Sequence, residues 1–276
     1  MFPLRYASPL YILREACARD LFGVLERLST LGFDGVEFLG FFGRTADAVR
    51  DKLDALGLAP LGNHVPYAAL LHDTAGVLEF HQTVGCRYLT VSELPTEDLT
   101  GLAMVLDTVA AEARARDITL LTHNHAQELR EQVGGQALLR CLLETVSSDT
   151  LRFEPDLGWI EIGGGDCAAY LTDYRDRCPV IHLKDYYASD LSLIGNAQEF
   201  LPDRGKADRG YFEFRPVGYG VLNLPRLLPL CLACGPEWLV MDHDLSYERD
   251  PFEDLRLSLD YTKRLVELQA QPLLPF

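Results

Sequence analysis

The chain has 276 residues, of which 48% are hydrophobic and 24% charged, and it carries a formal net charge of −16. This composition is typical of a globular protein, and the negative charge argues against binding to nucleic acid or to an anionic membrane surface. No run of about 18 apolar residues predicts a membrane span, and the N-terminus lacks the pattern of a signal peptide. The seven scattered cysteines fit reduced thiols, so we expect a cytoplasmic protein.

Short apolar runs alternate with amphipathic stretches along the chain. The apolar runs predict strands at 4–8, 35–40, 59–65, 87–93, 118–125, 151–156, 180–185 and 238–244. Apolar residues at helical spacing predict helices at 14–31, 45–56, 99–116, 136–146 and 252–268. This repeated alternation of strand and helix indicates a parallel sheet.

Eight such units within residues 1–276 favour one domain with an α/β fold, a (β/α)8 TIM barrel. A doubly wound open sheet is the alternative, but no glycine-rich GxGxxG turn follows the first strand. The segment 186–218 is interpreted as a long irregular loop, of the kind that often forms a lid or a binding loop. Its basic residues are interpreted either as a phosphate clamp or as solvated charges, and they are Arg204, Lys206, Arg209 and Arg215.

Ionisable side chains gather where the predicted strands end. In a barrel these ends surround the mouth, where the active sites of this fold lie. Packed carboxylates repel one another unless a cation lies among them, and oxygen ligands with a few imidazoles suit Mn²⁺, Mg²⁺, Co²⁺ or Zn²⁺. The residues concerned are Glu37, His64, Glu93, His123, Asn124, His125, Glu154, Asp156, His182, Lys184, Asp185, Asp242, His243 and Asp244.

At these residues the chain resembles the sugar phosphate isomerase/epimerase group of the xylose isomerase-like TIM barrel superfamily. The resemblance extends over nearly the whole chain and depends on the order and spacing of its motifs rather than on any one of them. The motifs are "GFDGVEFLG", "GNHVPY", "THNHAQEL", "PDLGW", "GGGD", "VIHLKD", "PVGYGVLNLPRLL", "WLVMDHD" and "RDPFEDLRLSLDYTKRL".

The resemblance implies a divalent metal ion and a set of residues that hold it. The implied metal ligands are Glu128, Asp156, His182 and Asp242. Glu128 and Asp242 are also the candidate catalytic base and acid. The chain departs from the pattern at Asp242, where the family usually has glutamate, and at Tyr219, where it usually has another glutamate. Within the "HNH" group, His125 or His123 is an alternative ligand to Glu128.

The candidate substrate contacts are Glu37, His64, His125, Trp159 and Lys184. The alternative for Glu37 is an ion pair with a neighbouring strand, and the alternative for His64 is a buried, hydrogen-bonded histidine. Trp159 is interpreted either as an apolar wall for a sugar or as packing, and Lys184 either as an anion-binding residue or as an ion-pair partner of Asp156 or Asp185.

Four acids and one cysteine pair have structural interpretations. Asp166, Asp185 and Asp244 are interpreted as helix caps or as partners of the ligands. Glu154 points the same way as Asp156 from one layer deeper, where it needs Lys184 or a histidine of the fifth strand as its partner. The CxxC pair at Cys231 is assigned to helix packing rather than to redox or zinc chemistry.

The predicted function is that of a metal-dependent isomerase or epimerase acting on a small sugar, keto-sugar or inosose-like polyol. It would abstract a proton next to a carbonyl group that the metal ion polarises. The alternatives are a dehydratase of the inosose or dehydroshikimate type and a non-catalytic barrel that binds a sugar acid. A nuclease of the endonuclease IV type is disfavoured by the negative charge. The expected partners are a small carbohydrate substrate and a second copy of the chain in a homodimer.

Overall fold

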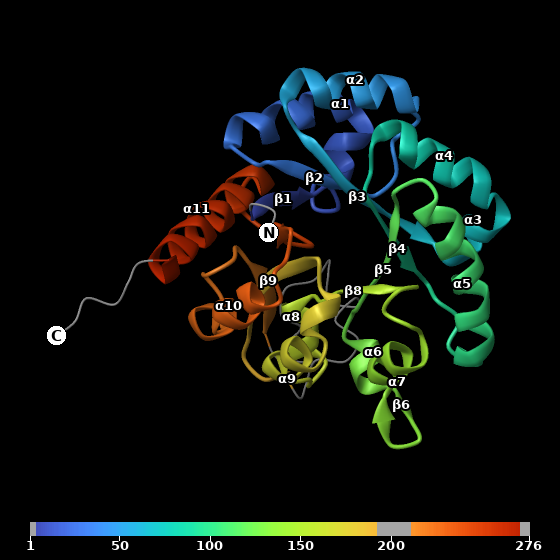
Figure 1. Cartoon of the computed structure of the whole chain (residues 1–276). Helices are drawn as coiled ribbons and strands as arrows, with labels where there is room; N and C mark the ends of the chain where they lie inside the picture. Colours follow the sequence, from blue (N-terminus) through green and yellow to red (C-terminus); the bar gives the residue numbers. More distant parts are fainter. Residues whose placement is uncertain (1–3, 192–210, 271–276) are drawn as a thin grey trace.

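The computed structural model describes residues 4–191 and 211–270, which form a barrel of strands surrounded by helices (Figure 1). Neighbouring parallel strands pair in chain order, and the last of them pairs with the first. A bridge between Asp156 and His182 closes the barrel between the sixth and seventh strands. The predicted (β/α)8 barrel is therefore confirmed. Its strands are β1 (Arg5–Pro9), β2 (Gly35–Phe38), β3 (Ala59–Pro66), β4 (Tyr88–Ser92), β5 (Thr119–His123), β8 (Arg152–Glu154), β9 (Val180–Ala188) and β11 (Trp238–Asp242).

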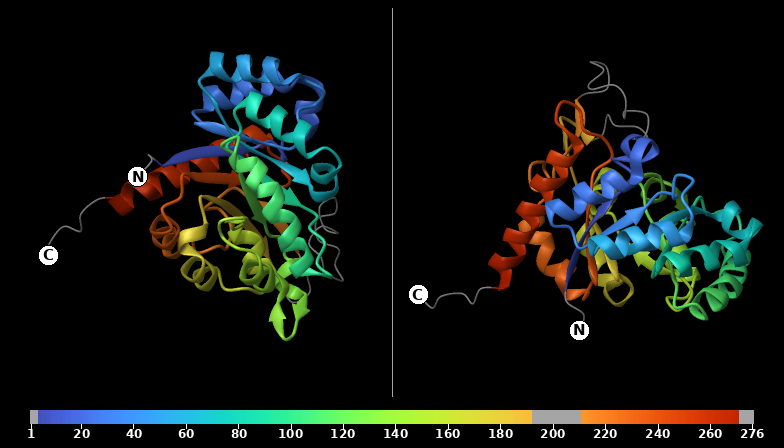
Figure 2. Two further views of the ribbon diagram at one scale, coloured as in Figure 1. Left: turned by 45° about the vertical axis from the view of Figure 1, so that its right-hand side comes forward. Right: turned by 90° about the horizontal axis from the view of Figure 1, so that it is seen from above.

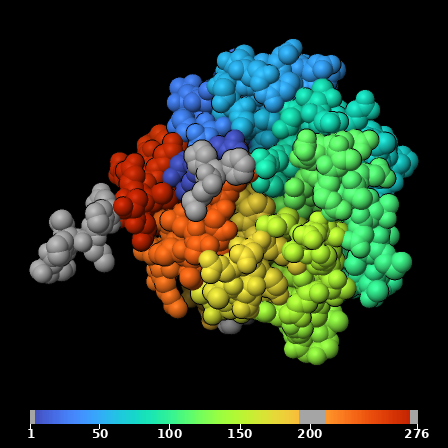
Figure 3. All heavy atoms as spheres, in the orientation of Figure 1, coloured from blue at the N-terminus to red at the C-terminus, as the bar shows by residue number. Residues whose placement is uncertain are grey.

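The helices lie outside the strands, as the views in Figure 2 show. Seen as in Figure 3, they follow one another round the molecule in chain order, from blue to red. None of the described helices is both long and apolar enough to cross a membrane. The helices are α1 (Arg14–Leu31), α2 (Ala46–Leu56), α3 (Tyr67–His72), α4 (Thr74–Val84), α5 (Leu99–Arg114), α6 (Gln127–Arg130), α7 (Leu138–Thr145), α8 (Leu157–Ile162), α9 (Cys167–Asp173), α10 (Leu224–Ala233) and α11 (Pro251–Ala270), with a 3₁₀ turn η1 (Arg175–Arg177).

All eight predicted strands are present, and each predicted helix coincides with an observed one to within a few residues. Residues 136–137 are an exception, because they form the short strand β7 (Gln136–Ala137), which pairs with β6 (Gln132–Val133) ahead of α7. The residues directly after the sixth strand form the short helix α8, which is not among the predicted helices. The Asp156 side chain accepts the Trp159 N–H at 2.9 Å and so caps this helix directly at the strand end.

The predicted irregular loop at 186–218 is also wrong in part. Strand β9 continues to Ala188, and β10 (Phe212–Arg215) pairs with it in antiparallel fashion. The two strands pair because they bury an aromatic cluster, in which the Tyr186 ring stacks on Phe212 with centroids 5.9 Å apart. Arg215 forms an ion pair with Glu213 on the same strand, whereas Arg204, Lys206 and Arg209 lie outside the described residues.

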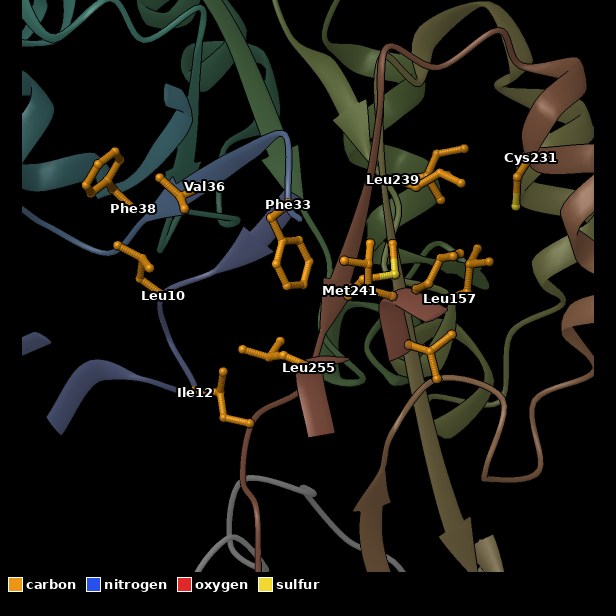
Figure 4. Close-up of a cluster of buried hydrophobic side chains, with 14 of the residues drawn as sticks. Leu10, Ile12, Phe33, Val36, Phe38, Leu157, Cys231, Leu239, Met241 and Leu255 are labelled. Carbon is orange, nitrogen blue, oxygen red and sulfur yellow. The ribbon is translucent and has the colours of Figure 1, made fainter. Parts of the chain in front are cut away.

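The strands carry apolar side chains on both faces, but on the interior face these give way to polar side chains towards the carboxyl end of most strands. On β11, Leu239 and Met241 face the helices (Figure 4). Trp238 and Val240, which alternate with them, face the interior. The interior residues from opposite sides of the barrel touch one another and fill its lower part; they are Ala7, Leu61, Tyr88, Leu121, Val180, Trp238 and Val240. Two residues after Val240 the interior face of β11 carries Asp242, and two residues after Val180 the interior face of β9 carries His182, which lies opposite Val240. Alternation along each strand therefore places an apolar floor beneath a polar layer.

A separate cluster of buried polar side chains attaches the last helix, α11, to the antiparallel pair of strands β9 and β10. Asp254 on α11 is 2% exposed, forms an ion pair with Arg249, accepts the Ser246 hydroxyl at 2.5 Å and lies 3.5 Å from His243 Nε2. The other ring nitrogen of His243 is 3.0 Å from the Arg215 carbonyl oxygen on β10. Burial opposes the charge of Asp254, but these partners outweigh it and lower the pKa of its carboxyl to about 2.

This network predicts a pH-dependent stability. We expect Asp254→Asn to lower the free energy of unfolding at pH 7 by about 1–2 kcal/mol. The pKa of about 2 in the folded protein lies below that of an unfolded aspartate, so the stabilisation is complete above about pH 4 and is lost as the pH falls towards 2. Urea denaturation of both proteins between pH 2 and pH 7 would show their stabilities converging at low pH.

The matched control is Asp260→Asn, on an exposed part of the same helix, where a change below about 0.5 kcal/mol is expected. A constant difference between wild type and Asp254→Asn across this pH range would contradict the assignment.

Candidate active site and metal centre

A cavity of about 590 Å³ opens at the carboxyl ends of the strands. Its size is that of a site for a small molecule. Most of the predicted site residues line it, together with three further acids and one further histidine. The lining includes Glu37, His64, Glu93, His123, His125, Glu128, Glu131, Trp159, His182, Lys184, Asp242 and Asp244.

Four buried or half-buried side chains form the first group of candidate ligands, which we call the glutamate group: His64, His123, Glu154 and His182. His64 Nε2 and His123 Nδ1 lie 3.3 and 3.4 Å from Glu154 Oε2. His182 Nε2 lies 3.5 Å from Glu154 Oε1. Glu37 adjoins this group, since its Oε2 is 3.3 Å from His64 Nε2 and 3.1 Å from His182 Nε2. Three imidazoles therefore surround two buried carboxylates.

Four side chains form a second group, the aspartate group: His123, Asp156, His182 and Asp242. It shares both histidines with the glutamate group. His182 Nδ1 is 2.9 Å from Asp242 Oδ2, and His123 Nε2 is 3.8 Å from Asp156 Oδ2. The Lys184 ammonium lies against both carboxylates, at 3.0 Å from Asp156 Oδ2 and 2.9 Å from Asp242 Oδ2.

The backbone around β8 and β9 holds these side chains in place. The Asn124 amide bonds to the backbone of Asp156, accepting its N–H at 3.0 Å. A side chain at Gly158 would place its Cβ 2.5 Å from the Lys184 carbonyl oxygen, so only glycine lets α8 approach β9 this closely. Asp185 accepts the N–H groups of Gly218, Gly220 and Leu222 at 3.0 Å and so fixes the segment after β10.

Charge compensation sets the protonation of the glutamate group. Burial disfavours the charge of His64, but Glu37 and Glu154 outweigh it and raise its pKa to about 10. The pKa of His182 is also raised, because the same two carboxylates and Asp242 outweigh its burial. His123 differs, because burial together with the two neighbouring imidazoles lowers its pKa to about 3.

In the aspartate group the two carboxyls differ. Burial raises the pKa of Asp156 to about 7, although Lys184 opposes the shift. For Asp242 the burial is outweighed by Lys184 and His182, which hold its pKa well below the ordinary value. Asp242 is therefore ionised, and it is better suited to binding a cation than to donating a proton.

Of the predicted metal ligands, the structure brings Asp156, His182 and Asp242 together and sets Glu128 apart. Glu128 lies on α6, in neither of the two groups found among the described residues. Its carboxylate accepts the His125 N–H at 2.9 Å and faces the same cavity, and burial raises its pKa. The carboxylate beneath the histidines is Glu154 instead, with His123 of the fifth strand as its predicted partner.

The predicted substrate contacts also have definite positions. Glu37, His64, His125 and Lys184 line the cavity, and Lys184 forms the expected ion pair with Asp156. Trp159 is 2% exposed, so it packs against Phe214 with ring centroids 5.6 Å apart and still borders the cavity.

Three other predicted roles can be compared with the structure. Tyr219 is 53% exposed and packs near Tyr261. Asp166 caps α9, as predicted. Cys231 packs in the hydrophobic core, and all seven cysteines, which lie in the described part of the chain, are free.

The donor atoms fit a divalent cation. Buried atoms without a hydrogen-bond partner of suitable geometry converge here from six residues in the described part of the chain: Glu37 Oε1, His64 Nε2, His123 Nδ1, Glu154 Oε1, Asp156 Oδ2 and His182 Nε2. Such atoms are costly unless a ligand or an ion satisfies them. Imidazole nitrogens and carboxylate oxygens are ordinary ligands of zinc and of the other transition-metal ions.

The role of Lys184 predicts a large effect on stability. Lys184 is 1% exposed and is the ammonium group shared by Asp156, Asp242 and Asp244. We expect Lys184→Met to lower the free energy of unfolding by about 3–5 kcal/mol, because it leaves buried carboxylates without their counter-ion.

The matched control is Lys52→Met, which removes an ion pair with the exposed Glu26 and is expected to cost less than about 1 kcal/mol. Denaturation in the absence of metal ions measures both changes. Equal losses in the two variants would show that Lys184 does not balance the buried charge.

Comparisons with known proteins agree with this architecture. The model of the xylose isomerase-like TIM barrel family matches residues 25–265. A sequence comparison with curated proteins finds no match.

Solved structures show the same fold. A sugar phosphate isomerase/epimerase from Parabacteroides distasonis is similar at 18% identity with a TM-score of 0.71, over 97% of this chain and 94% of that one. The probable 3-DHS dehydratase AsbF from Bacillus anthracis is similar at 10% identity with a TM-score of 0.70, over 94% and 98%. The IOLI protein, solved with a zinc atom, is similar at 14% identity with a TM-score of 0.71, over 96% and 98%.

The family match covers most of the chain, and the closed barrel with its site at the carboxyl ends of the strands agrees with it. The chain belongs to the xylose isomerase-like TIM barrel family.

Proposed function

We propose that the protein is a metal-dependent isomerase or epimerase of a small sugar, keto-sugar or inosose-like polyol. The observation that carries the proposal is a cavity that combines a layer of candidate metal ligands with a separate carboxyl group, that of Glu128, on its wall. Proton abstraction beside a carbonyl group needs both parts, a positive charge to stabilise the oxygen and a base to take the proton. Relatives of the same fold are named as sugar phosphate isomerase/epimerase, and one holds zinc.

The histidines and carboxylates of the aspartate group hold the ion. This group includes three of the four metal ligands that the sequence predicts, Asp156, His182 and Asp242. His123 takes the place of Glu128, the fourth. A divalent ion bound there supplies a Lewis acid that makes a hydrogen beside a carbonyl group acidic. Mn²⁺, Mg²⁺, Co²⁺ and Zn²⁺ all remain candidates for this role.

Glu128 is the proposed base. Burial raises the pKa of its carboxyl, which brings it closer to the pH at which a general base works best. The hydrogen bond from the His125 N–H, at 2.9 Å, holds the carboxylate in place on the wall of the cavity. Isomerisation between neighbouring carbons needs only one such group, which removes the proton from one carbon and returns it to the next.

The remaining walls suit a polyhydroxy ligand. Glu37 and His64 provide a carboxylate and a charged imidazole for hydroxyl groups. His125 meets the Trp159 ring edge-on with centroids 5.7 Å apart, which gives the cavity an apolar side for the C–H face of a sugar ring.

The first test is exchange of the substrate's acidic hydrogen with solvent. Metal-loaded protein in D₂O, incubated with a panel of keto-sugars and inososes, should introduce deuterium beside the carbonyl group of a substrate, as followed by NMR. We expect Glu128→Gln to slow this exchange by about 10²- to 10⁴-fold, because the base is lost. Its metal content should stay unchanged, since Glu128 lies outside both donor groups in the described residues.

Glu131→Gln is the control, because Glu131 is an exposed acid at the edge of the same cavity. Chelation should stop the exchange, and one of the four divalent ions should restore it. An unsaturated product would assign the dehydratase chemistry instead. Absence of exchange with every ion and substrate, or exchange that survives chelation, would refute the proposal.

A further inference from the structure

The two donor groups overlap at two imidazoles. His123 and His182 belong to both, while His64 and Glu154 belong only to the glutamate group and Asp156 and Asp242 only to the aspartate group. A neutral imidazole binds a metal ion through one nitrogen. An ion in one group therefore uses the histidines that an ion in the other group would need, and the two groups are alternative positions for a single ion.

Lys184 distinguishes the two positions. Its ammonium lies 3.0 and 2.9 Å from the carboxylates of Asp156 and Asp242, which are both carboxylate donors of the aspartate group. Asp244 holds the ammonium from a third side, with both oxygens within 3.0 Å. A divalent ion among these carboxylates would have to displace a buried cation of the same sign.

The glutamate group carries no such fixed cation. In the described part of the chain, the ion pairs of Glu37 and Glu154 are all with histidines, namely His64, His123 and His182. An ion that enters the glutamate group therefore meets no lysine or arginine side chain paired with these carboxylates in the described part of the chain.

Unpaired donor atoms point to the same position. His64 Nε2, His123 Nδ1, Glu154 Oε1 and His182 Nε2 all lack a hydrogen-bond partner of suitable geometry within the described residues. Glu154 is 0% and His182 1% exposed, so water does not satisfy them from bulk solvent. Each residue of the glutamate group thus has a buried donor atom that makes no hydrogen bond within the described residues, and the donor atoms of the group lie within 4.8 Å of one another, as a bound ion requires.

We propose that the glutamate group is the resting metal site of this chain, and that it selects Zn²⁺ or Co²⁺ over Mg²⁺ and Mn²⁺. Three imidazoles with one carboxylate favour the softer ions, while the two carboxylates of the aspartate group are more favourable to Mn²⁺ and Mg²⁺. This inference shares with the proposed function only the premise that the chain binds a divalent ion. It assigns that ion, in the absence of substrate, to His64, His123, Glu154 and His182.

Paired variants test the assignment through metal affinity. Zinc affinity is measured on metal-free full-length protein by competition with a chromophoric chelator. We expect Glu154→Gln and His64→Asn to weaken Zn²⁺ binding by at least about tenfold, because each removes a ligand. Asp156→Asn and Asp242→Asn keep all four ligands of the glutamate group and should weaken Zn²⁺ binding less than either of the first two variants. Wild-type protein should bind one Zn²⁺ per chain, more tightly than Mn²⁺.

X-ray absorption of zinc-loaded wild-type protein gives an answer that needs no variant. The glutamate group predicts three imidazoles on the ion, and the aspartate group two. Losses that are larger for the aspartate variants or equal in all four, two imidazoles on zinc, a preference for Mn²⁺, or two ions per chain would each overturn the proposal. Those outcomes leave the proposed function standing, whereas failure to bind any divalent ion would overturn both.

Discussion

Burial of carboxylates inside the barrel is the constraint on which the site depends. Five of them, Glu37, Glu154, Asp156, Asp242 and Asp244, are at most 7% exposed. Unit charges 4 Å apart interact by about 4 kcal/mol at an effective dielectric constant of about 20, so uncompensated carboxylates would oppose folding. Lys184 and the two charged histidines offset three of the five charges. A proton on Asp156, whose pKa rises to about 7, compensates for one of the remaining two, and a divalent ion would compensate for both.

The register of the barrel strands brings the buried charged side chains together in one layer at the mouth of the barrel. Side chains alternate along β9 and β11, so Val180 and Val240 fill the interior where His182 and Asp242 follow two residues later. The apolar floor excludes water from beneath the polar layer, and the open mouth admits a ligand from above. Each charge–charge contact is therefore stronger than it would be at the surface, which explains why one ammonium group holds three carboxylates together.

The sequence predicts the barrel well because each buried parallel strand is a short apolar run, and every one after the first has an ionisable residue at or near its end. It predicts the convergence of Asp156, His182 and Asp242 for the same reason. It does not predict that Glu128 lies apart from them, because α6 carries it away from the strand and only the loop conformation decides its reach. The pairing of β9 with β10 is also missed, because it joins segments distant in sequence and leaves no local periodicity.

Lys184 and a divalent ion are competitors for the same carboxylates, and the two imidazoles separate them. His182 faces Asp242 through Nδ1 and Glu37 through Nε2, so one ring contacts both the lysine-bound carboxylates and the lysine-free ones. His123 spans the same boundary, between Asp156 and Glu154. With the ion in the glutamate group, the rings of His123 and His182 lie between it and the Lys184 ammonium, so the two positive charges are not direct neighbours. An ion in the aspartate group would leave Lys184 with Asp244 as its remaining carboxylate partner, whose two oxygens lie 2.9 and 3.0 Å from the ammonium.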